Sequence, residues 1–507
     1  MGTNLLPSVD SDTLQLPDAV RARIASNLAD PGTPEGAAVV EVAEAAGGGQ
    51  VTAATGDAFL GAAVALAEGN QSFAIQATGD STTVPDTAWF RLLANAVAAR
   101  FPALVHHYRK WNESTLDFDQ PVVLNAPSDA TRRALVMAAG TASQRSGPQS
   151  PGPNVTGDLD ARVNLRMPSY VPGETQAIIG KWTNDASRSW LLLINSTGTL
   201  RYSAYNADGS TLVDKISTAP VALADNTDGW IRVVHDVDNG ASGNDVKFYT
   251  STDGVTWTQV GTTQTATGVV ALNPSTSRYI VGHRGSNSLT AGTKIYAIQV
   301  RDGINGPNIV PIMPEHWARS IGQYEPTLEG TPVVTWLMAG RSGGGLGYDY
   351  QTPFDTPAGT TASYLTQYMR HMSPNYGQLV TFFSSSHNDY QARNALWATR
   401  LSAWVTGVTA DKLTSARIVL TQNPRTVADP GTDGHRARRA LTLAWARQFP
   451  GVDVIDTYQA FLNDGRALSD LVNPADGVHP TGPGYQVWAA AVQGELDAAL
   501  ALVTAKP

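Results

Sequence analysis

The stretch SFAIQATGDSTT, residues 72–83, decides how the first part of the chain folds. Its first seven residues form an apolar, strand-like run, and Gly79-Asp80-Ser81 then reads as a turn. Pro85 and Asp86 suit the first turn of a helix. The apolar residues that follow recur at helical spacing: Trp89, Leu92, Leu93, Ala96 and Val97. The pattern predicts a β–turn–α unit with Ser81 in the turn at the top of the strand.

The same alternation returns after about Gly330. Strand-like runs occupy residues 333–338, 378–383, 416–420 and 452–456, and helical patterns occupy residues 362–372, 396–405, 436–449 and 485–500. Strands that alternate with helices indicate a parallel sheet covered on both faces. We therefore expect residues 72–100 and the last third of the chain to build one α/β domain, with the segment between them inserted into it.

The segment between these two parts has a different sequence pattern, with turns and short strands in place of alternating strands and helices. A linker rich in Gly and Pro (146–153) leads into short strands, with no convincing helix from 155 to 300. Turn signals separate many of these strands: Asp208-Gly209, Asp228-Gly229, Asn239-Gly240 and Asp253-Gly254. Short strands at regular spacing predict a β-sandwich. The run "DGWIRVVHDVDNG…NDVKFYTSTDGVTWTQVG" resembles the concanavalin-type (laminin-G-like) lectin sandwiches, a jelly-roll fold, found in bacterial and phage surface proteins.

Composition excludes several classes of function. The 35 Lys and Arg residues against 44 Asp and Glu give a net charge of −9, which argues against a nucleic-acid partner. The absence of cysteine excludes disulfides, thiolate nucleophiles and Cys-ligated metals. No apolar run approaches the length of a membrane span, and residues 1–7 lack the features of a secretory signal. We expect such a protein to leave a cell by lysis or within an assembly.

Three local signals lie at the ends of predicted strands, where open α/β sheets bind ligands. They are Gly79-Asp80-Ser81, Ser386-His387-Asn388-Asp389 and Asp476-Gly477-Val478-His479-Pro480. Each is a common turn by itself, but the three in this order resemble the SGNH (GDSL-type) hydrolases over residues 71–103 and 331–500. The resemblance implies a flavodoxin-like three-layer fold and a Ser-His-Asp esterase.

The resemblance also implies a role for each residue. Ser81 would be the nucleophile, and Asp476 and His479 would complete the triad. The oxyanion hole would consist of the N–H groups of Ser81 and Gly343 and the side-chain amide of Asn388. Ser386 stands where the family has glycine, and the insertion before residue 331 is a second departure.

The proposed chemistry requires these residue types. A serine hydroxyl is a weak nucleophile until an imidazole accepts its proton, and a carboxylate orients that imidazole and stabilises its cation. The negative oxygen of a tetrahedral intermediate needs preplaced donors, each worth about 3 kcal/mol of barrier.

Other interpretations of the same residues stay open. Ser81 can cap a helix, Asn388-Asp389 can be a capping pair, and His479 can be a surface histidine. Gly340-Arg341-Ser342-Gly343-Gly344 matches the Gly-x-Ser-x-Gly elbow of α/β-hydrolases, but the glycines after Ser342 make a poor helix start.

No metal or cofactor is expected. His106 and His107 are adjacent on a probable strand, so their side chains point to opposite faces. Calcium in the sandwich and an acidic hairpin loop are both compatible with four oxygen-bearing residues: Asp236, Asp238, Asn239 and Asp245. Six aromatic residues divide between the core and possible sugar-stacking positions: Trp182, Trp190, Trp230, Trp257, Tyr202 and Tyr205.

The predicted division of the chain has five parts. Residues 1–70 form an attachment or oligomerisation segment, and 71–103 with 331–503 form the hydrolase. Residues 104–149 are an extended connector, 150–305 the lectin-like sandwich and 306–330 a return linker.

The leading functional prediction is an SGNH-type serine esterase that acts on esterified, foremost acetylated, cell-surface glycan as part of a phage tail. Its partners would be bacterial glycan, other tail proteins through residues 1–70, and further copies of the chain in a homo-oligomer. It would act outside the cell, at the host surface, without a membrane span. The alternative is a non-enzymatic glycan-binding or receptor-binding tail protein with a decayed hydrolase domain.

Overall fold

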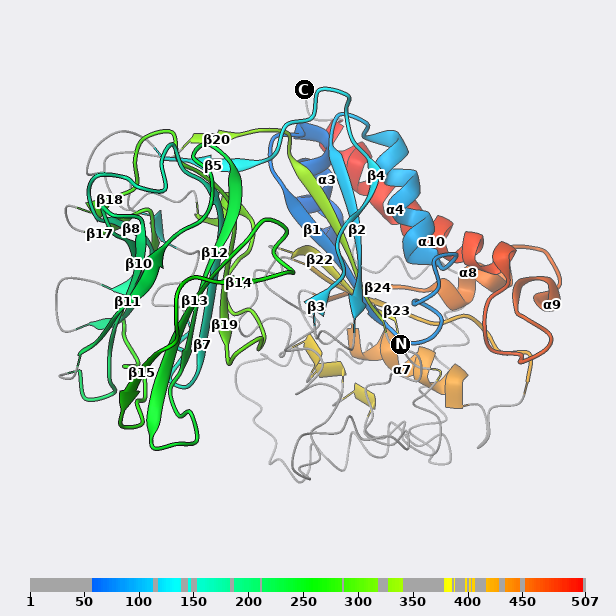
Figure 1. Ribbon diagram of the computed structural model, residues 1–507. Coiled ribbons are helices and arrows are strands. Elements are labelled where there is room, and N and C mark those ends of the chain that lie inside the picture. The colour runs from blue at the N-terminus through cyan, green and yellow to red at the C-terminus, as the bar shows by residue number, and fades with distance from the viewer. Residues whose placement is uncertain are drawn as a thin grey trace, which may run out of the picture.

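The computed structural model contains a mixed α/β sheet and, beside it, two antiparallel sheets (Figure 1). The residues that it describes are 57–112, 117–137, 145–146, 153–182, 187–209, 212–284, 287–317, 327–340, 378–384, 387, 397–398, 401–402, 404–405, 416–427, 434–446 and 452–504.

The α/β sheet is built around β1 (Phe73–Gly79), all seven residues of which are buried. β21 (Val333–Gly340) and β22 (Gln378–Ser384) pair with β1 in parallel on either side. Three more parallel strands extend the sheet: β23 (Ala416–Leu420), β24 (Val452–Ile455) and, beyond β21, β2 (Val105–Asn112). Two short strands, β3 (Asp117–Phe118) and β4 (Val122–Asn125), pair with β2 in antiparallel fashion. The spatial order is β24-β23-β22-β1-β21-β2-β3.

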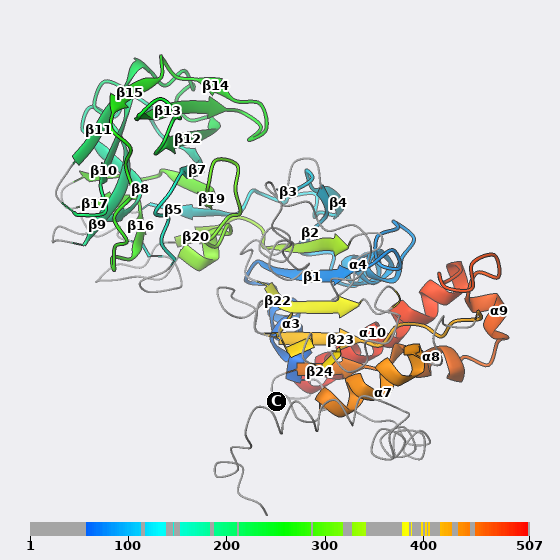
Figure 2. The same ribbon diagram turned by 90° about the horizontal axis from the view of Figure 1, so that it is seen from below.

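Three helices cover one face of this sheet (Figure 2): α3 (Asp57–Glu68), α4 (Trp89–Arg100) and α10 (Gly482–Thr504). The indole rings of Trp89 and Trp488 stack at 6.0 Å between centroids, and Phe382 of β22 packs edge-on against Trp89. Alternation along β1 sends Phe73, Ile75 and Ala77 to this core.

By length and composition alone, α10 could cross a membrane. Its apolar residues Trp488, Val492 and Leu496 lie instead in the core with α3 and α4. A long core helix of this kind passes the same test as a membrane span, so α10 is described here as a core helix.

The described part of the chain also contains α7 (Gly434–Ala446), which contacts β24, and α8 (Thr457–Asn463) and the short α9 (Leu468–Leu471), which contact α10. The described residues between 397 and 405 are also helical. Trp397 and Trp404 pack on Phe383 of β22, on the face away from α3. The helix predicted over residues 362–372 lies outside the described residues.

The β-sandwich consists of two antiparallel sheets. The first has the order β11-β10-β9-β8-β16-β6: Leu212–Pro220, Thr199–Tyr205, Arg188–Ile194, Gln176–Trp182, Tyr279–Val281 and Arg145–Ser146. The second has the order β14-β13-β12-β7-β19-β5-β20: Thr258–Gln259, Gly243–Ser251, Asp228–Asp236, Leu159–Arg166, Lys294–Asp302, Ala134–Val136 and Thr327–Glu329. β15 (Gln264–Thr267) pairs with β13, and β17 (His283–Arg284) forms a hairpin with β18 (Asn287–Ser288).

The predicted turns of the sandwich are mostly where the sequence indicates. Gly209, Gly240 and Gly254 adopt positive φ angles of 69°, 72° and 75°, which glycine accepts without strain. Asp228-Gly229 is different, because both residues belong to β12. A Cβ on Gly229 would lie 2.4 Å from the Leu223 side chain, so this glycine serves packing within the strand.

The predictions of a connector over residues 104–149 and a return linker over 306–330 are wrong, because both segments contribute strands to the sheets. Residues 104–149 contain β2, which belongs to the α/β sheet, and β5, which belongs to the sandwich. Residues 306–330 supply β20, which pairs with β5. The reason is that these strands complete both sheets at their edges, a long-range pairing that local texture does not reveal.

The predicted segment 1–70 also divides. Residues 57–68 form α3, whose Phe59, Ala62 and Leu66 are buried against the sheet. This part is an element of the α/β core. Residues 1–56 lie outside the described residues.

The sandwich packs on the α/β sheet, beside the face that α3, α4 and α10 leave uncovered. A small apolar cluster joins Leu337 and Ala339 of β21 to Ile312 and Met313, with Ala297 of β19 against it. The remaining members of the cluster are Ala74, Trp111 and Phe118. An ion pair between Arg301 of β19 and Asp117 of β3 also links the two parts. The inserted sandwich is thus in direct contact with the α/β sheet.

Candidate active site

The turn after β1 is held tightly at the carboxyl edge of the sheet. A Cβ on Gly79 would lie 2.2 Å from Thr83 Oγ1 and 2.7 Å from the Ser384 carbonyl oxygen, so only glycine fits. The Asp80 N–H donates to that same Ser384 carbonyl at 3.3 Å, and the Thr83 N–H closes the turn on the Asp80 carbonyl at 2.9 Å. These contacts place the next residue, Ser81, at the strand's end.

Ser81 lies next to His479, which is 398 residues away in the chain. The Ser81 Oγ and His479 Nε2 atoms are 2.8 Å apart. On the other side of the ring, His479 Nδ1 lies 3.0 Å from Asp476 Oδ2. Since a carboxylate can only accept, Nδ1 carries the proton and Nε2 accepts from the serine hydroxyl. The structure therefore brings together the three residues that the sequence assigns to a triad, in the hydrogen-bonded order that a triad needs.

The loop before α10 fixes the geometry of this pair. Asp476 Oδ1 accepts from the N–H groups of Val478 at 2.8 Å and His479 at 2.9 Å. The Asn473 N–H donates to the His479 carbonyl at 2.8 Å, which closes the loop. Gly477 has a φ of 65°, and a Cβ there would lie 2.4 Å from Val427 Cγ1. The three-residue spacing thus places the Asp476 carboxylate under its own histidine.

These contacts set the charge of Asp476. Partial burial opposes its ionisation, but the two backbone donors and the His479 ring outweigh that effect and lower the pKa of Asp476 below its usual value. The carboxylate is therefore ionised at neutral pH. A negative charge beside Nδ1 stabilises the imidazolium that forms when Ser81 loses its proton.

Asp80 has the opposite environment. It is fully buried, and burial raises its pKa more than its hydrogen bonds and the nearby His479 lower it. Its donors are Gln422 Nε2 at 2.8 Å and the N–H and hydroxyl of Thr82 at 2.9 and 2.7 Å. The side chain of Asp80 thus supports the turn from beneath rather than facing a substrate.

A buried polar network connects the turn to the loops on either side of it. Gln422, which follows β23, accepts from the His387 N–H at 2.6 Å while donating to Asp80. Asn423 Oδ1 lies 3.0 Å from His387 Nε2, and Asn423 Nδ2 donates to the Val478 carbonyl at 2.8 Å. Arg425 Nε lies 3.2 Å from His387 Nδ1. The segment around residue 387 is thereby tied to the loop that carries His479.

Sequence reasoning missed this network. The sequence pattern assigns no role to His387, although it belongs to the signal Ser386-His387-Asn388-Asp389, and none to Gln422, Asn423 or Arg425. One signal was available, since Thr421-Gln422-Asn423 places polar residues directly after a predicted strand in a parallel sheet.

The predicted oxyanion residues Gly343 and Asn388 lie outside the described residues, as do Ser386 and the rival serine Ser342. Gly340 ends β21 and Ser384 ends β22, at the same sheet edge as the turn that carries Ser81.

The structure decides some of the alternatives. The helix after the turn begins at Trp89, with Ala88 as its N-cap residue, so Ser81 does not cap it. His106 and His107 do point to opposite faces: His106 is buried against Phe101 and Trp336, and His107 lies at a cavity next to the sandwich. Burial lowers the pKa of each to about 4, so both are neutral at pH 7.

Three of the four oxygen-bearing residues of the sandwich, Asp238, Asn239 and Asp245, have hydrogen-bond partners within the hairpin and the neighbouring strand. Asp245 Oδ1 accepts from Thr265 Oγ1 at 2.7 Å and from Asn239 Nδ2 at 3.1 Å, and Asp238 accepts from the Gly240 N–H. This arrangement favours the hairpin interpretation. Within the described ranges, no group of three or more His, Asp or Glu side chains is placed to hold a metal ion.

The aromatic residues of the sandwich separate into two groups. Trp190 and Tyr202 are buried in its core, and Trp182 is 5% exposed on the outer side of the first sheet, beside Tyr205. Trp230 and Trp257 are half-buried at the face of the second sheet. Tyr205 is half-buried as well, so these three of the six keep ring surface that a ligand could reach.

No protein-family model matches the chain, and no curated protein does. Solved structures that resemble it include a peptidoglycan O-acetylesterase, at 11% identity over 88% of this chain and 96% of that one, with a TM-score of 0.30. The CBM40 domain of the Ruminococcus gnavus IT-sialidase matches 34% of this chain and 93% of its own length, at 12% identity and a TM-score of 0.25. Mouse laminin α1 domains LG4-5 match 43% of this chain and 52% of theirs, at 12% identity and a TM-score of 0.27. At such scores these neighbours, an esterase and lectin-like domains, are similar to the chain without carrying an argument about its ligand.

Proposed function

We propose that this protein is a serine esterase of the SGNH type that removes acyl groups, foremost acetyl, from a cell-surface glycan. The observation that carries the proposal is the continuous hydrogen-bonded chain from Ser81 through His479 to Asp476. A serine that merely caps a turn has no need of an imidazole held by a carboxylate.

The sheet topology supports the SGNH assignment. Apart from β2, the parallel strands follow one another along the chain as β1, β21, β22, β23 and β24, and they lie in space in the order β21-β1-β22-β23-β24. With the strands counted from one to five along the chain, this is the order 2-1-3-4-5. This is the order of flavodoxin-like sheets, which bind ligands at the carboxyl ends of their strands. Ser81 and the loop of His479 meet at that edge.

In the first half of the reaction, Ser81 Oγ attacks the acyl carbon while His479 Nε2 takes its proton. The tetrahedral oxygen carries the negative charge, and the resemblance assigns its stabilisation to the N–H groups of Ser81 and Gly343 and the amide of Asn388. When the intermediate collapses, the bond to the sugar oxygen breaks and His479 returns the proton to that oxygen. The products are a free sugar hydroxyl and an acyl-Ser81 ester.

In the second half, water attacks the acyl-Ser81 ester with His479 as the general base. The bond to Ser81 Oγ breaks, the serine recovers its proton, and the carboxylic acid leaves. No metal or cofactor takes part in these steps.

We further propose that the sandwich binds the glycan and that the protein works at the host surface as part of a phage tail. The lectin-like sequence pattern and the featureless N-terminal sequence motivate this placement. Residues 1–56 are the part of the predicted attachment segment left for contacts with other tail proteins, because α3 belongs to the core.

The decisive experiment is hydrolysis of p-nitrophenyl acetate, and then of acetylated glycans, by the wild type and by Ser81→Ala. We expect Ser81→Ala to lose turnover while its circular dichroism and melting temperature stay unchanged. Ser342→Ala serves as the control and should keep most activity. If the wild type hydrolyses none of the esters faster than Ser81→Ala does, the result would favour the alternative, a glycan-binding protein with a decayed hydrolase domain.

A further inference from the structure

A cavity of about 1000 Å³ lies between the sandwich and the α/β sheet. Figure 1 shows these two parts side by side, with β7 and β19 of the sandwich turned toward β2 and β3 of the sheet. The cavity is lined by Arg162, Arg232 and Trp257 on the sandwich side and by His107 and Phe118 on the sheet side. Its volume is at the upper end of the range typical of small-ligand sites.

Two arginines in the cavity wall share a single carboxylate. Asp160 is fully buried and accepts from Nε and Nη2 of Arg162 at 2.9 and 2.6 Å and of Arg232 at 2.9 and 2.8 Å. These contacts hold the pKa of Asp160 at about 2 despite its burial, so it is ionised. Two guanidinium groups against one carboxylate leave one positive charge without a counter-ion in this cluster.

The cluster is rigid. Asn305 Oδ1 accepts from Nη2 of Arg162 at 2.7 Å and of Arg232 at 2.9 Å, and the Asn305 N–H donates to Asp160 Oδ2 at 3.0 Å. Asn305 holds a left-handed φ of 57° to do so. Both arginine side chains are more than nine-tenths buried, at 9% and 8% exposure. Long cationic side chains so confined lose their rotamer freedom in advance of any ligand.

The third nitrogen of each guanidinium remains available. Within the described ranges, no acceptor contacts Nη1 of Arg162 or of Arg232, while Nε and Nη2 of each are fully engaged. Arg301, another arginine in the cavity lining, is paired with Asp117 of β3. A cation that is buried and only partly satisfied is costly, so its retention in a cavity wall points to a ligand.

Aromatic rings complete the wall. The guanidinium carbons of Arg162 and Arg232 lie 5.4 and 5.1 Å from the Trp257 ring centroid. Trp230 packs edge-on against Trp257 at 6.3 Å between centroids, and both rings are half-buried. The ring of Trp257 thus stacks on the fixed positive charge, and Trp230 beside it adds apolar surface to the wall.

We propose that this cavity binds a carboxylate-bearing sugar of a polymeric glycan. A guanidinium fork matches a planar carboxylate, and one uncompensated positive charge matches a monoanion. Trp257 and Trp230 supply surface for the apolar face of a sugar ring, and Gln299 and Asn305 in the lining supply amides for its hydroxyls.

The position of the cavity suits a polymer. Ser72, at its edge, immediately precedes β1, and Ser81 follows the other end of that strand. The strand spans about 20 Å, a separation that a chain of several sugars exceeds. The proposal deepens the glycan-binding role proposed above and rests on it in taking the ligand to be a sugar.

The test uses the full-length protein and three acidic sugars: glucuronate, galacturonate and N-acetylneuraminate. Glucose is the neutral control, and glucose 6-phosphate is the phosphate control. Binding is followed by tryptophan fluorescence and calorimetry at low and high salt. We expect at least one acidic sugar to bind more than tenfold tighter than glucose and glucose 6-phosphate. Binding of none of the three, or equal binding of glucose 6-phosphate, would overturn the assignment.

Variants locate the site. Arg232→Met leaves Asp160 paired one-to-one with Arg162, so the fold should persist while acidic-sugar affinity falls at least tenfold. Trp257→Ala should weaken binding as well. Arg201→Met is the matched control, because Arg201 forms a bidentate pair with Asp214 on the other sheet. If Arg232→Met keeps its melting temperature and its affinity, the site is elsewhere and the proposal fails.

One further variant separates this proposal from the esterase. Ser81→Ala should bind the acidic sugars as the wild type does. Binding without esterase activity in the wild type would remove the proposed reaction and leave the site intact. Esterase activity without acidic-sugar binding would remove the proposed binding site and leave the proposed reaction intact.

Discussion

At the residue scale, the Asp476 side chain does two jobs with two oxygens. One oxygen caps the N–H groups of Val478 and His479, and the other faces His479 Nδ1. In Asp476→Asn the capping oxygen can remain, but an amide N–H would then face Nδ1 and force the proton onto Nε2. His479 could no longer accept the proton of Ser81.

We therefore expect Asp476→Asn to lower kcat for p-nitrophenyl acetate by roughly 10³–10⁴ with little change in KM. Steady-state kinetics measures this, and Asp464→Asn, which removes an exposed partner of Arg466, is the control. A loss of less than tenfold would take Asp476 out of the triad.

The pKa of Asp476 also predicts a pH dependence of stability. Because the fold lowers this pKa, the ionised carboxylate stabilises the native state. That contribution is complete above the unfolded value of about 3.9 and is lost as the pH falls through the lower folded value. The difference in urea midpoint between the wild type and Asp476→Asn should be largest near pH 6 and shrink toward pH 3. A difference that grows as the pH falls would contradict the sign.

At the element scale, the 473–480 loop depends on Gly477. Gly477 and Gly465 both have positive φ angles, 65° and 85°, but only at Gly477 would a Cβ meet a neighbour. We expect Gly465→Ala to cost about 1 kcal/mol of stability and leave activity unchanged. Gly477→Ala should lose more stability, and kcat at least tenfold, because the clash with Val427 displaces His479.

Urea unfolding and kinetics on the same preparations distinguish the two effects. Val427→Ala combined with Gly477→Ala should recover part of kcat, since it removes the side chain that the new Cβ meets. Equal kcat values for Gly477→Ala and the wild type would mean that the loop tolerates the shift.

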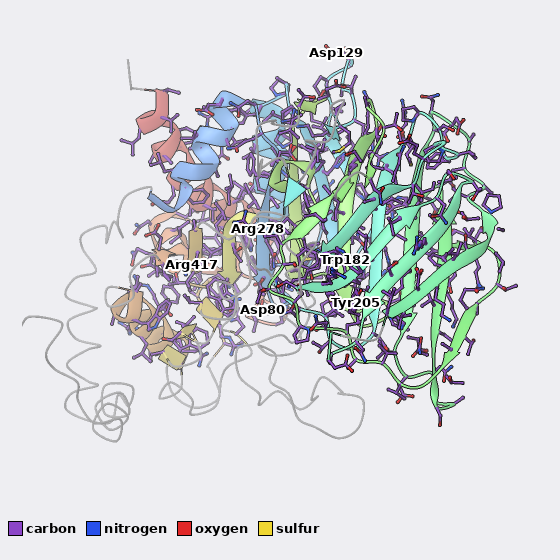
Figure 3. All side chains as sticks on the ribbon, turned by 90° about the vertical axis from the view of Figure 1, so that its left-hand side faces the viewer. Asp80, Asp129, Trp182, Tyr205, Arg278 and Arg417 are labelled. Carbon is purple, nitrogen blue, oxygen red and sulfur yellow. The ribbon has the colours of Figure 1, made fainter. Side chains whose placement is uncertain are left out.

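At the scale of the whole molecule, the chain enters and leaves the sandwich through two neighbouring segments, around Thr131 and Thr331, which connect it to the α/β domain. The Thr331 N–H donates to the Thr131 carbonyl at 2.9 Å, and the Thr131 N–H donates to Thr331 Oγ1 at 3.1 Å. The excision point is therefore near these two residues, which keeps β5 and β20 with the sandwich to which they belong. Figure 3 shows the sandwich and the α/β part beside each other, with Trp182 and Tyr205 labelled on the sandwich and Asp80 on the α/β part.

Replacing residues 133–329 by a short Gly/Ser linker should spare turnover of p-nitrophenyl acetate but weaken action on acetylated polymer. The variant should also melt at a lower temperature, because Leu337, Ala339 and Trp111 lose their apolar cover. Turnover per folded molecule and melting curves measure the two effects. Equal loss on both substrates would make the sandwich a structural part of the catalytic site.

The sequence by itself determined the parts of this protein that depend on local patterns. Strand and helix periodicity located β1, β21, β22, β23, β24 and α10, and glycine turns located three of the connections between sandwich strands, at Gly209, Gly240 and Gly254. The pairing of Asp476 with His479 is equally local, because three residues and two backbone donors suffice to orient the carboxylate.

Only the tertiary structure decided what meets across long stretches of chain. It decided to which sheets β2, β5 and β20 belong, that α3 is buried, and that Asn423 contacts Val478. Each of these contacts joins distant segments, and the local composition of a segment does not indicate its partner. The cavity has the same origin, since Arg162, Arg232 and Asn305 converge from three separate elements. Periodicity reports which face of an element is apolar, but which faces meet is set by how the whole core packs.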